Sequence, residues 1–247
     1  MNNHERQDYM TITKITVWVG TLVLLAVATG CNNSRYGPAY DQKQPQIRSV
    51  AILPAKVEMY ALHSGGIEER RPDLDDHVRD RVVKTIQEVL DKRGATSISL
   101  PPPLEEDESA NIPVGQQLAL LHAVAEGVVV HHYAYGKERI IEYATGDAVG
   151  VLGADDCDAV LCVIVRGVVP TEGRKFLKGA AVVVGAITGI RFHVKTNEAV
   201  IMLLLVDRKT GEVLWFNFEH DEKHIAGEHR VRSFVKDACA YLLKPRK

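Results

Sequence analysis

The chain has 247 residues, of which 46% are hydrophobic and 25% charged, and its formal net charge is −2. This composition is typical of a globular protein, and the length allows one large domain or a domain with elaborations. Acidic and basic residues are interspersed, so nothing in the charge pattern predicts nucleic-acid binding.

The first residues of the chain have the features of a secretory signal peptide. Lys14 precedes an apolar stretch of roughly fifteen residues, and the small residues 28–30 lead to Cys31. This arrangement resembles the lipobox of bacterial lipoproteins, in which the chain is cut before the cysteine and the cysteine is acylated. We therefore expect residues 1–30 to be a lipoprotein signal peptide and Cys31 to carry lipid, palmitate included.

Two other interpretations of this segment stay open. A transmembrane anchor would need about twenty apolar residues, and residues 15–30 supply fewer. An ordinary signal peptide, cut a few residues earlier, would leave Cys31 as a free thiol. Glu5 and Asp8 offset the basic charge that normally precedes the apolar stretch, and a start at Met10 would remove both acids.

The next part of the chain changes character at residue 47. Residues 31–46 are polar, contain prolines and show no apolar period, which predicts a flexible tether. We place a single α/β domain at residues 47–247. Its first strand is expected over residues 47–53, where Pro54 stops an apolar run, and residues 55–72 have the character of a loop.

Two helices and a strand are predicted after this loop. Apolar residues at helical spacing predict a helix from Leu74 onward, with Asp73 as its N-cap and Gly94 just past its end. A strand over residues 95–100 and an exposed, proline-rich and acidic connection are expected to follow. A second helix is predicted over residues 115–132, although its last residues could equally open a strand.

The middle of the chain contains two strongly apolar segments. Residues 158–165 predict a central strand. Residues 176–190 are apolar, contain three glycines and have basic residues on both sides. We interpret this second segment as a buried helix or helical hairpin on the sheet. The alternatives are an element that contacts the membrane, with basic flanks toward anionic head groups, and a self-association surface.

A β-hairpin is predicted from residues 199–206 and 212–218, because Gly211 can supply the positive φ of the turn. In its second strand one face is expected to be strongly apolar and the other mixed. The residues of the two faces are Leu214, Phe216 and Phe218, against Val213, Trp215 and Asn217.

The chain closes with a predicted helix. Apolar residues between Val231 and Leu242 line one helical face, and Pro245 ends the pattern. The complete order of elements predicts an α/β fold, with a mixed sheet, helices packed on it, and a C-terminal β-hairpin followed by a helix.

Histidine pairs are the first candidates for a metal site. His220 and His224 are four apart, a spacing that brings two ligands together on a helix. Their segment follows a strand and precedes Gly227, so we expect neither a helix nor a metal there. His131 and His132 are adjacent and would point in different directions on a helix, which predicts a solvated or half-buried pair.

No catalytic constellation stands out, and we predict no catalytic residue, no cofactor and no enzymatic activity. The sequence lacks the Gly-x-Ser-x-Gly elbow of serine hydrolases. The glycines between residues 146 and 153 are spaced too loosely for a dinucleotide-binding loop. Asp155, Asp156 and Asp158 precede the central strand and are interpreted as solvated loop carboxylates, not as ion ligands.

Three cysteines follow Cys31. They are Cys157, Cys162 and Cys239, an odd number, so at least one thiol is unpaired unless it bonds another chain. Cys157 and Cys162 are five apart, which on a strand places them on opposite faces and argues against a mutual disulfide. We expect buried, inert thiols.

Several of these pieces occur together in a known family. They are the lipobox cysteine, the strand at residues 48–54, the Asp-Ala-Val-Leu sequence at 158–161 and the Asp-x-x-Thr-Gly-x-x-x-Trp hairpin at 207–215. Together they resemble the uncharacterised bacterial outer-membrane lipoproteins related to curli-secretion-type lipoproteins and to the amino-terminal domain of the translocation protein TolB. The resemblance covers most of residues 47–243.

The resemblance implies a periplasmic α/β domain at the outer membrane, often in envelope assembly or secretion, and it carries over no catalytic residue. Asn32 after the cysteine is a residue that outer-membrane sorting favours. Curli-secretion pores are built from two long hairpins, whereas residues 176–190 form one short run, so pore formation is not expected.

These observations predict a lipoprotein held in the outer membrane through lipid on Cys31 and facing the periplasm. Its domain would bind or scaffold envelope proteins or copies of itself, and would not bind nucleic acid. The alternative is an oligomeric secretion component that contacts the membrane through residues 176–190. A metal-dependent hydrolase around His220 and His224 is a less favoured alternative.

Overall fold

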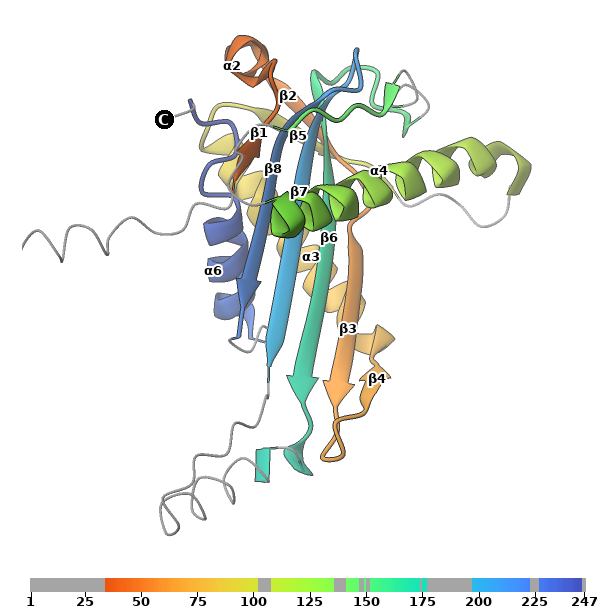
Figure 1. Cartoon of the computed structure of the whole chain (residues 1–247), viewed down its shortest axis with the longest axis vertical. Coiled ribbons are helices and arrows are strands. Elements are labelled where there is room, and N and C mark those ends of the chain that lie inside the picture. Colours follow the sequence, from red (N-terminus) through yellow and green to blue (C-terminus); the bar gives the residue numbers. More distant parts are fainter. Residues whose placement is uncertain are drawn as a thin grey trace, which may run out of the picture. The chain divides into compact units, whose positions relative to one another are not determined.

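A single mixed sheet of eight strands carries four helices in the described part of the chain (Figure 1), which confirms the predicted α/β class. The computed structural model describes residues 34–101, 108–135, 141–146, 149, 152–173, 175–176, 197–222 and 227–245.

Six strands form the main path of the sheet. In sheet order they are β1 (Arg35–Tyr36), β8 (Val213–Asp221), β7 (Glu198–Asp207), β6 (Ala159–Pro170), β2 (Ser49–Ile52) and β5 (Thr96–Ser99). The β1·β8, β7·β8 and β6·β7 pairs are antiparallel, whereas β2 is parallel to both β5 and β6. The predicted hairpin is β7·β8, and the predicted central strand is β6.

Two further strands extend the sheet beyond Pro54. β3 (Lys56–Leu62) continues along β6 where β2 stops, and β4 (Glu68–Arg70) pairs antiparallel with β3. Val50 pairs with Ala159, 109 positions on, whereas Lys56 pairs with Ile164, 108 positions on. The interruption therefore inserts one extra residue opposite β6, as a β-bulge does, at a proline that cannot donate a ladder hydrogen bond.

The loop predicted over residues 55–72 is wrong, because this segment contains β3, β4 and the start of a helix. In β3 the residues Val57, Met59 and Ala61 are buried and alternate with more exposed residues such as Glu58. This period of two marks a strand with one buried face, but it contains no continuous apolar run.

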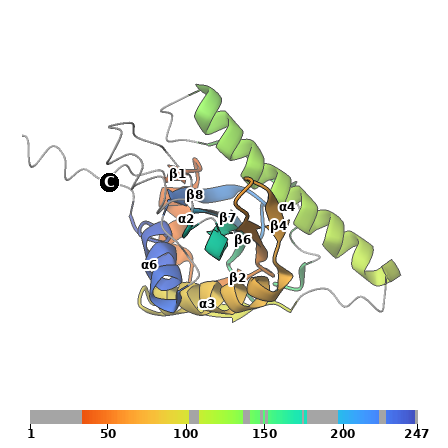
Figure 2. The same ribbon diagram turned by 90° about the horizontal axis from the view of Figure 1, so that it is seen from below.

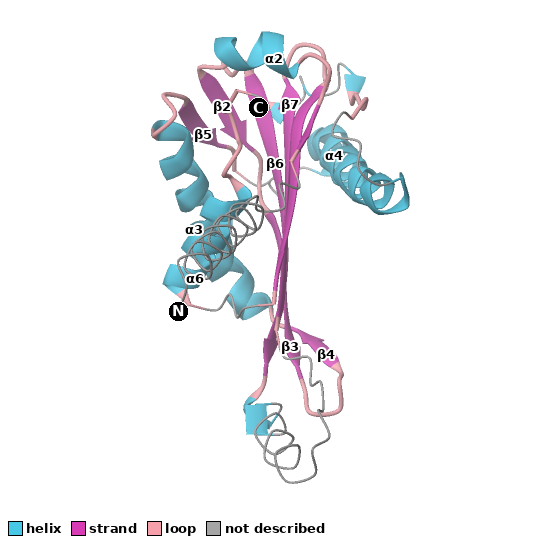
Figure 3. Ribbon diagram, turned by 60° about the vertical axis from the view of Figure 1, so that its left-hand side comes forward, coloured by secondary structure: helices cyan, strands magenta, loops and turns pink. Residues whose placement is uncertain are grey.

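Helices cover both faces of the sheet. They are α2 (Tyr40–Lys43), α3 (Pro72–Asp91), α4 (Glu108–Tyr135) and α6 (Glu228–Ala238). Figures 2 and 3 show α3 and α6 side by side on one face and α4 across the opposite face. The helices predicted from Leu74, over 115–132 and from Val231 are thus confirmed, although α3 begins with Arg71 and not Asp73 as its N-cap.

The sheet separates two hydrophobic cores. On one face Ile86 of α3 and Val235 of α6 pack with Trp215. On the other face Leu121 of α4 packs with Cys162 and other strand residues. Every residue from Ala159 to Val165 is buried, because β6 is covered on both faces.

The pairing of the hairpin corrects the predicted faces of β8. The register shifts at residues 205–206 of β7, where Leu214 is the extra residue on β8. Leu214 and Trp215 consequently both contribute to the α3–α6 core, while Phe216 and Phe218 contribute to the α4 core. The predicted apolar face of Leu214, Phe216 and Phe218 is therefore wrong, because a bulge interrupts the alternation.

No helix in the described part of the chain combines the length and the apolarity that crossing a bilayer requires. The longest of these helices, α4, has 28 residues. The interpretation of residues 176–190 falls outside the described residues, apart from Phe176, whose side chain is exposed.

The flexible tether predicted over residues 31–46 is wrong for residues 34–46, while residues 31–33 lie outside the described residues. β1 pairs with β8, and the Gly37 amide donates to the Leu214 carbonyl at 2.8 Å. Tyr36 and Tyr40 are buried, with ring centres 4.9 Å apart. Burial of two aromatic rings offsets the entropy cost of ordering this polar segment.

Replacing Gly37 with alanine is expected to displace this segment from the hairpin. A Cβ atom at position 37 would lie 1.9 Å from the Val213 carbonyl oxygen. Overpacking of this kind lowers the free energy of unfolding by about 1–3 kcal/mol, measurable by urea denaturation. Gly65→Ala is the matched control, since nothing lies within 4 Å of a Cβ there. Equal midpoints for the two variants would contradict the docked position of residues 34–46.

Candidate functional site

Cys31, the predicted lipid-attachment residue, lies outside the described residues, but the structure describes the chain from Ser34 onward. Ser34 is fully buried, and its hydroxyl donates to Asn217 Oδ1 at 3.3 Å. The Asn217 amide in turn donates to the Ala238 carbonyl at 2.7 Å. The chain therefore enters the domain between β8 and the end of α6. We call residues 34–46 the anchor junction.

The anchor junction is also fixed to the last described residues of the chain. The Tyr40 hydroxyl donates to the Lys244 carbonyl at 2.8 Å, and the Gln44 side-chain amide donates to the Leu243 carbonyl at 3.0 Å. Burial raises the pKa of Tyr40, so its phenol stays a neutral donor. These contacts join segments about 200 residues apart, as the separations of 204 and 199 positions show.

A third contact ties the anchor junction to the β7–β8 turn. The Lys43 ammonium lies 3.1 Å from Asp207, whose carboxylate also accepts hydrogen bonds from the amides of Lys209 and Thr210. Burial alone would raise the pKa of Asp207, but these hydrogen bonds and Lys43 lower it overall. Gly211 has a φ of +69°, which confirms the glycine requirement predicted for this turn.

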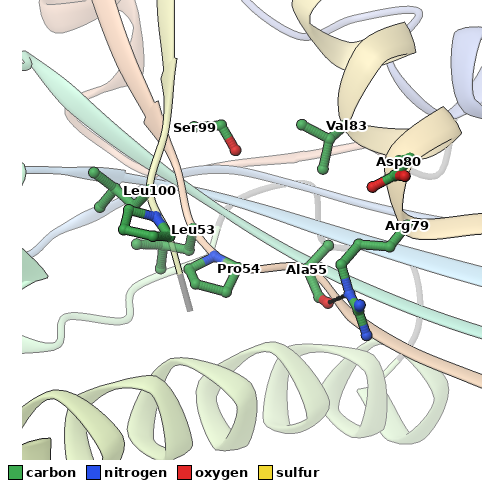
Figure 4. Close-up of a pocket in the computed structure, with 9 residues that line it drawn as sticks. Leu53, Pro54, Ala55, Arg79, Asp80, Val83, Ser99 and Leu100 are labelled. Carbon is green, nitrogen blue, oxygen red and sulfur yellow. Dashed lines mark hydrogen bonds between the residues drawn. The ribbon is translucent and has the colours of Figure 1, made fainter. Parts of the chain in front are cut away.

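A cavity of about 490 Å³ lies at the break between β2 and β3 (Figure 4). Its walls come from residues 53–55 at the break, residues 99–101 at the end of β5, and Arg79, Asp80 and Val83 of α3. Bulges and the carboxyl ends of parallel strands are common positions for ligand sites.

One polar group of this cavity, the Arg79 guanidinium, holds the break. Arg79 Nε donates to the Ala55 carbonyl at 3.1 Å, as Figure 4 shows, and the Arg79 guanidinium also pairs with Asp76. The other walls contribute mainly apolar surface, the Ser99 hydroxyl and the Asp80 carboxylate. This set can pack a small apolar group, but it lacks the paired nucleophile and base of covalent catalysis.

Of each predicted histidine pair, the structure describes the surroundings of one side chain. His220 lies on β8, not on a helix, with its Nε2 3.5 Å from Glu198 Oε1 on β7, while His224 lies outside the described residues. The ring of His131 lies 6.3 Å from that of Tyr143. Among the described residues there is no group of three or more histidine, cysteine or acidic side chains that could hold a metal ion.

The aspartates before β6 have structural partners. Asp158 is exposed, as predicted, but its carboxylate accepts hydrogen bonds from the amides of Arg48 and Ser49 at 2.8 and 3.0 Å. Burial alone would raise the pKa of Asp158, and these hydrogen bonds lower it overall. Asp155 pairs with Arg208. Asp158 thus joins the start of β2 to β6, in addition to being exposed to solvent.

The three described cysteines are buried and free, in agreement with the prediction of inert thiols. Burial raises the pKa of Cys162 and of Cys239 to about 12, so both stay protonated at neutral pH. Cys157 precedes β6 and shares the α4 core with Cys162. The prediction that these two cysteines lie on opposite faces is therefore wrong.

Sequence analysis does not single out a cluster around Tyr60 on β3. The Arg70 and Arg166 guanidinium groups lie 5.3 and 4.9 Å from the centre of the Tyr60 ring. Arg70 also donates to the buried Asp75 at 2.7 Å, and Asp75 accepts from the Met59 amide at 2.9 Å. These contacts fix β4 and the start of α3. No local sequence pattern predicts them.

Neither the family models nor the curated proteins compared with this sequence match it. Solved structures that resemble it include the PelC dodecamer from Paraburkholderia phytofirmans, with 11% identity, a TM-score of 0.37, and 87% of this chain and 96% of that chain covered. The lipoprotein GNA1162 from Neisseria meningitidis has 13% identity and a TM-score of 0.32, with 80% and 99% covered. The LpoB C-terminal domain from Salmonella enterica has 11% identity and a TM-score of 0.28, with 76% and 96% covered.

The compared structures thus include a bacterial lipoprotein, but likeness at this level carries no conclusion about the function of this chain. The finer relation to curli-secretion-type lipoproteins and to TolB stays a prediction.

The acidic end of β8 gives the domain a pH dependence. Burial, together with Asp237 and Asp221, raises the pKa of Glu219. A carboxyl group with a raised pKa binds its proton more tightly in the folded state than in the unfolded chain. Stability is therefore lost as the pH rises through the pKa of Glu219 in the folded protein.

Replacing Glu219 with glutamine is expected to raise the melting temperature at pH 7 and above, because the substitution removes a charge that the fold disfavours. The gain should shrink as the pH falls toward the ordinary pKa range of glutamate, where both forms are neutral. Thermal unfolding followed by circular dichroism at several pH values measures this. Glu142→Gln, at an exposed position, is the control, and a pH-independent difference between the two variants would count against the assignment.

Proposed function

We propose that this chain is a lipoprotein held in the outer membrane by lipid on Cys31. Its α/β domain faces the periplasm, where it binds or scaffolds other envelope components without catalysis. The observation that carries the proposal is the apolar leader, which ends in small residues at Cys31 and is followed almost at once by the folded sheet. The relation to curli-secretion-type lipoproteins and TolB is part of this proposal.

The distance between the anchor and the domain is short. Only Asn32 and Asn33 separate Cys31 from Ser34. An extended chain spans at most about 3.6 Å per residue, so the Cα atoms of Cys31 and Ser34 are at most about 11 Å apart. Because Ser34 is buried and bonded to Asn217, the domain stays close to the bilayer. We infer that its partners are components at or near that membrane.

The described part of the surface favours a binding function over an enzymatic one. Three apolar side chains protrude from α4 and from the edge strand β5: Leu120 and Val130 are 41% and 65% exposed, and Ile98 is 43% exposed. An exposed apolar residue on an edge strand favours pairing with another chain. The described thiols, in contrast, are buried, and the cavity at the β2–β3 break is mainly apolar.

An oligomeric secretion component that contacts the membrane through residues 176–190 is the second candidate. The observation in its favour is that Phe176, the first residue of that segment, is 76% exposed. A detergent-dependent oligomer of the protein without its lipid would support this candidate, and a monomer in plain buffer would count against it.

Intact-mass analysis of the native protein beside a Cys31→Ala variant tests the main proposal. We expect the wild-type mass to show cleavage before Cys31 plus acyl chains, and the protein to fractionate with the outer membrane. The Cys31→Ala variant should lack acyl chains and keep its leader, because the acylated cysteine is required for the cut. An Asn32→Asp variant is the matched control, which should be acylated but retained in the inner membrane. An unmodified cysteine in a soluble wild-type protein would overturn the proposal.

A further inference from the structure

The edge of the sheet at β5 presents a row of backbone groups that the sheet does not use. β5 is the last strand of the main path, and among the described strands it pairs with β2 alone. The amides of Thr96 and Leu100 donate to carbonyl groups on the β2 side at 2.7 and 2.9 Å. In a parallel ladder every second residue bonds to the same neighbour, so the amides and carbonyls of Ser97 and Ser99 point out of the sheet. A further strand could pair with them there.

Apart from its length of four residues, β5 has none of the features that usually block the pairing of an exposed strand. Natural edge strands are often protected by charged side chains, above all lysine, by proline or by a bulge. The sequence of β5 is Thr-Ser-Ile-Ser, and its pairing with β2 is regular over all four residues. The Ile98 side chain is 43% exposed. A proline follows only at position 101, so the free edge ends there.

The cavity at the β2–β3 break lies at the end of the same strand. Ser99 belongs both to the free edge and to the wall of the cavity. Figure 4 shows Ser99 on one side of the cavity, and Val83 and Asp80 of α3 on the other. Ser99 pairs with Ile52, whose side chain lies in the α3–α6 core, so the Ser99 side chain is on the α3 face of the sheet. A strand added beside β5 would therefore present every second side chain toward α3 and this cavity.

The charges beside the cavity favour a basic group in whatever binds there. The Arg79 guanidinium is engaged by the Asp76 carboxylate and by the Ala55 carbonyl. The Asp80 carboxylate, in contrast, is exposed and has no partner among the described residues. This turn of α3 carries two acidic residues and one basic residue, so its charge complements that of a lysine or an arginine.

We propose that the edge of β5 and the adjoining cavity bind an extended peptide segment of a partner protein. We call residues 97–99 together with the cavity walls the β5 site. The segment adds a strand to the sheet through Ser97 and Ser99, places an apolar side chain in the cavity, and brings a basic side chain to Asp80. An extended main chain supplies alternating donors and acceptors at the spacing of an edge strand, which a lipid or a helix does not. The inference rests on the binding role in the proposed function and names the class of partner.

Fluorescence anisotropy with a synthetic peptide tests the β5 site in the detergent-solubilised, full-length mature protein. The probe is a labelled Thr-Lys-Thr-Phe-Thr-Lys-Thr peptide, in which phenylalanine and both lysines share one face of a strand, whichever way the strand runs. We expect saturable binding. Replacing phenylalanine with alanine should weaken the binding about tenfold or more, because the ring is the group that the cavity removes from water.

Two N-methylated isomers of the probe separate backbone pairing from side-chain contact. Alternate amides of a strand point to opposite sides, so only one alternate set can donate to β5. One isomer is methylated at both lysine amides, and the other at the two threonine amides that flank phenylalanine. We expect one isomer to lose binding and the other to keep it, and the one that binds shows whether the added strand is parallel or antiparallel. Equal affinity of both isomers and the unmodified probe would overturn the inference.

Charge reversal on the protein provides a matched pair of variants. Asp80→Lys should weaken binding of the lysine probe about twofold to fivefold and strengthen binding of a probe with glutamate in place of both lysines. Asp91→Lys, at an exposed position at the end of the same helix, should leave both affinities unchanged. Equal changes in the two variants, or no saturable binding to the wild type, would overturn the inference. A dimer that excludes the probe and that Ile98→Lys dissociates would also overturn it, with a second copy as the occupant of the edge.

Mass analysis of the same preparation separates this result from a failure of the proposed function. A protein with acylated Cys31 that does not bind the probe refutes the β5 site alone. A protein with unmodified Cys31 that binds the probe refutes the lipid anchor and leaves the β5 site intact.

Discussion

The docking of the anchor junction onto β8 is the constraint on which the account of this protein depends. Backbone pairing of Arg35 and Tyr36 with β8, the Gly37 amide bond to Leu214 and the buried ring of Tyr40 act together. Because these contacts begin at Ser34, the predicted lipid on Cys31 would be joined to the folded domain by a short segment and not by a long flexible tether. The Tyr40 hydroxyl also donates to the Lys244 carbonyl, which joins the anchor junction to the last described residues of the chain.

Those parts of the fold with a regular apolar period could be predicted from the sequence. The central strand β6, the β7–β8 hairpin and the helices α3 and α6 all follow from local spacing and from Gly211. β3 has only one buried face and no apolar run, so it has the composition of a loop. The extra residue at Leu214 is a property of strand pairing, which the pattern of one strand does not contain.

The candidate site likewise has one part that could be predicted from the sequence and one part that could not. The prediction for Cys31 uses a local signal, the apolar leader and small residues before it, and it stays a prediction. The anchor junction depends on partners such as Lys244, 204 positions from Tyr40. No local pattern in a polar, proline-containing segment predicts such contacts. Two tyrosines close together in that segment were the available hint, since aromatic rings are costly to leave in water.

Amide hydrogen exchange in the native protein tests the docked junction most directly. The decisive amide is that of Gly37, which donates to the Leu214 carbonyl at 2.8 Å. The account predicts that this amide exchanges on the slow timescale of the β7–β8 pairing, because it opens only when the edge of the sheet opens. Exchange of Gly37 and its neighbours at the rate of an unstructured peptide would show a flexible tether, and would contradict the docked anchor junction.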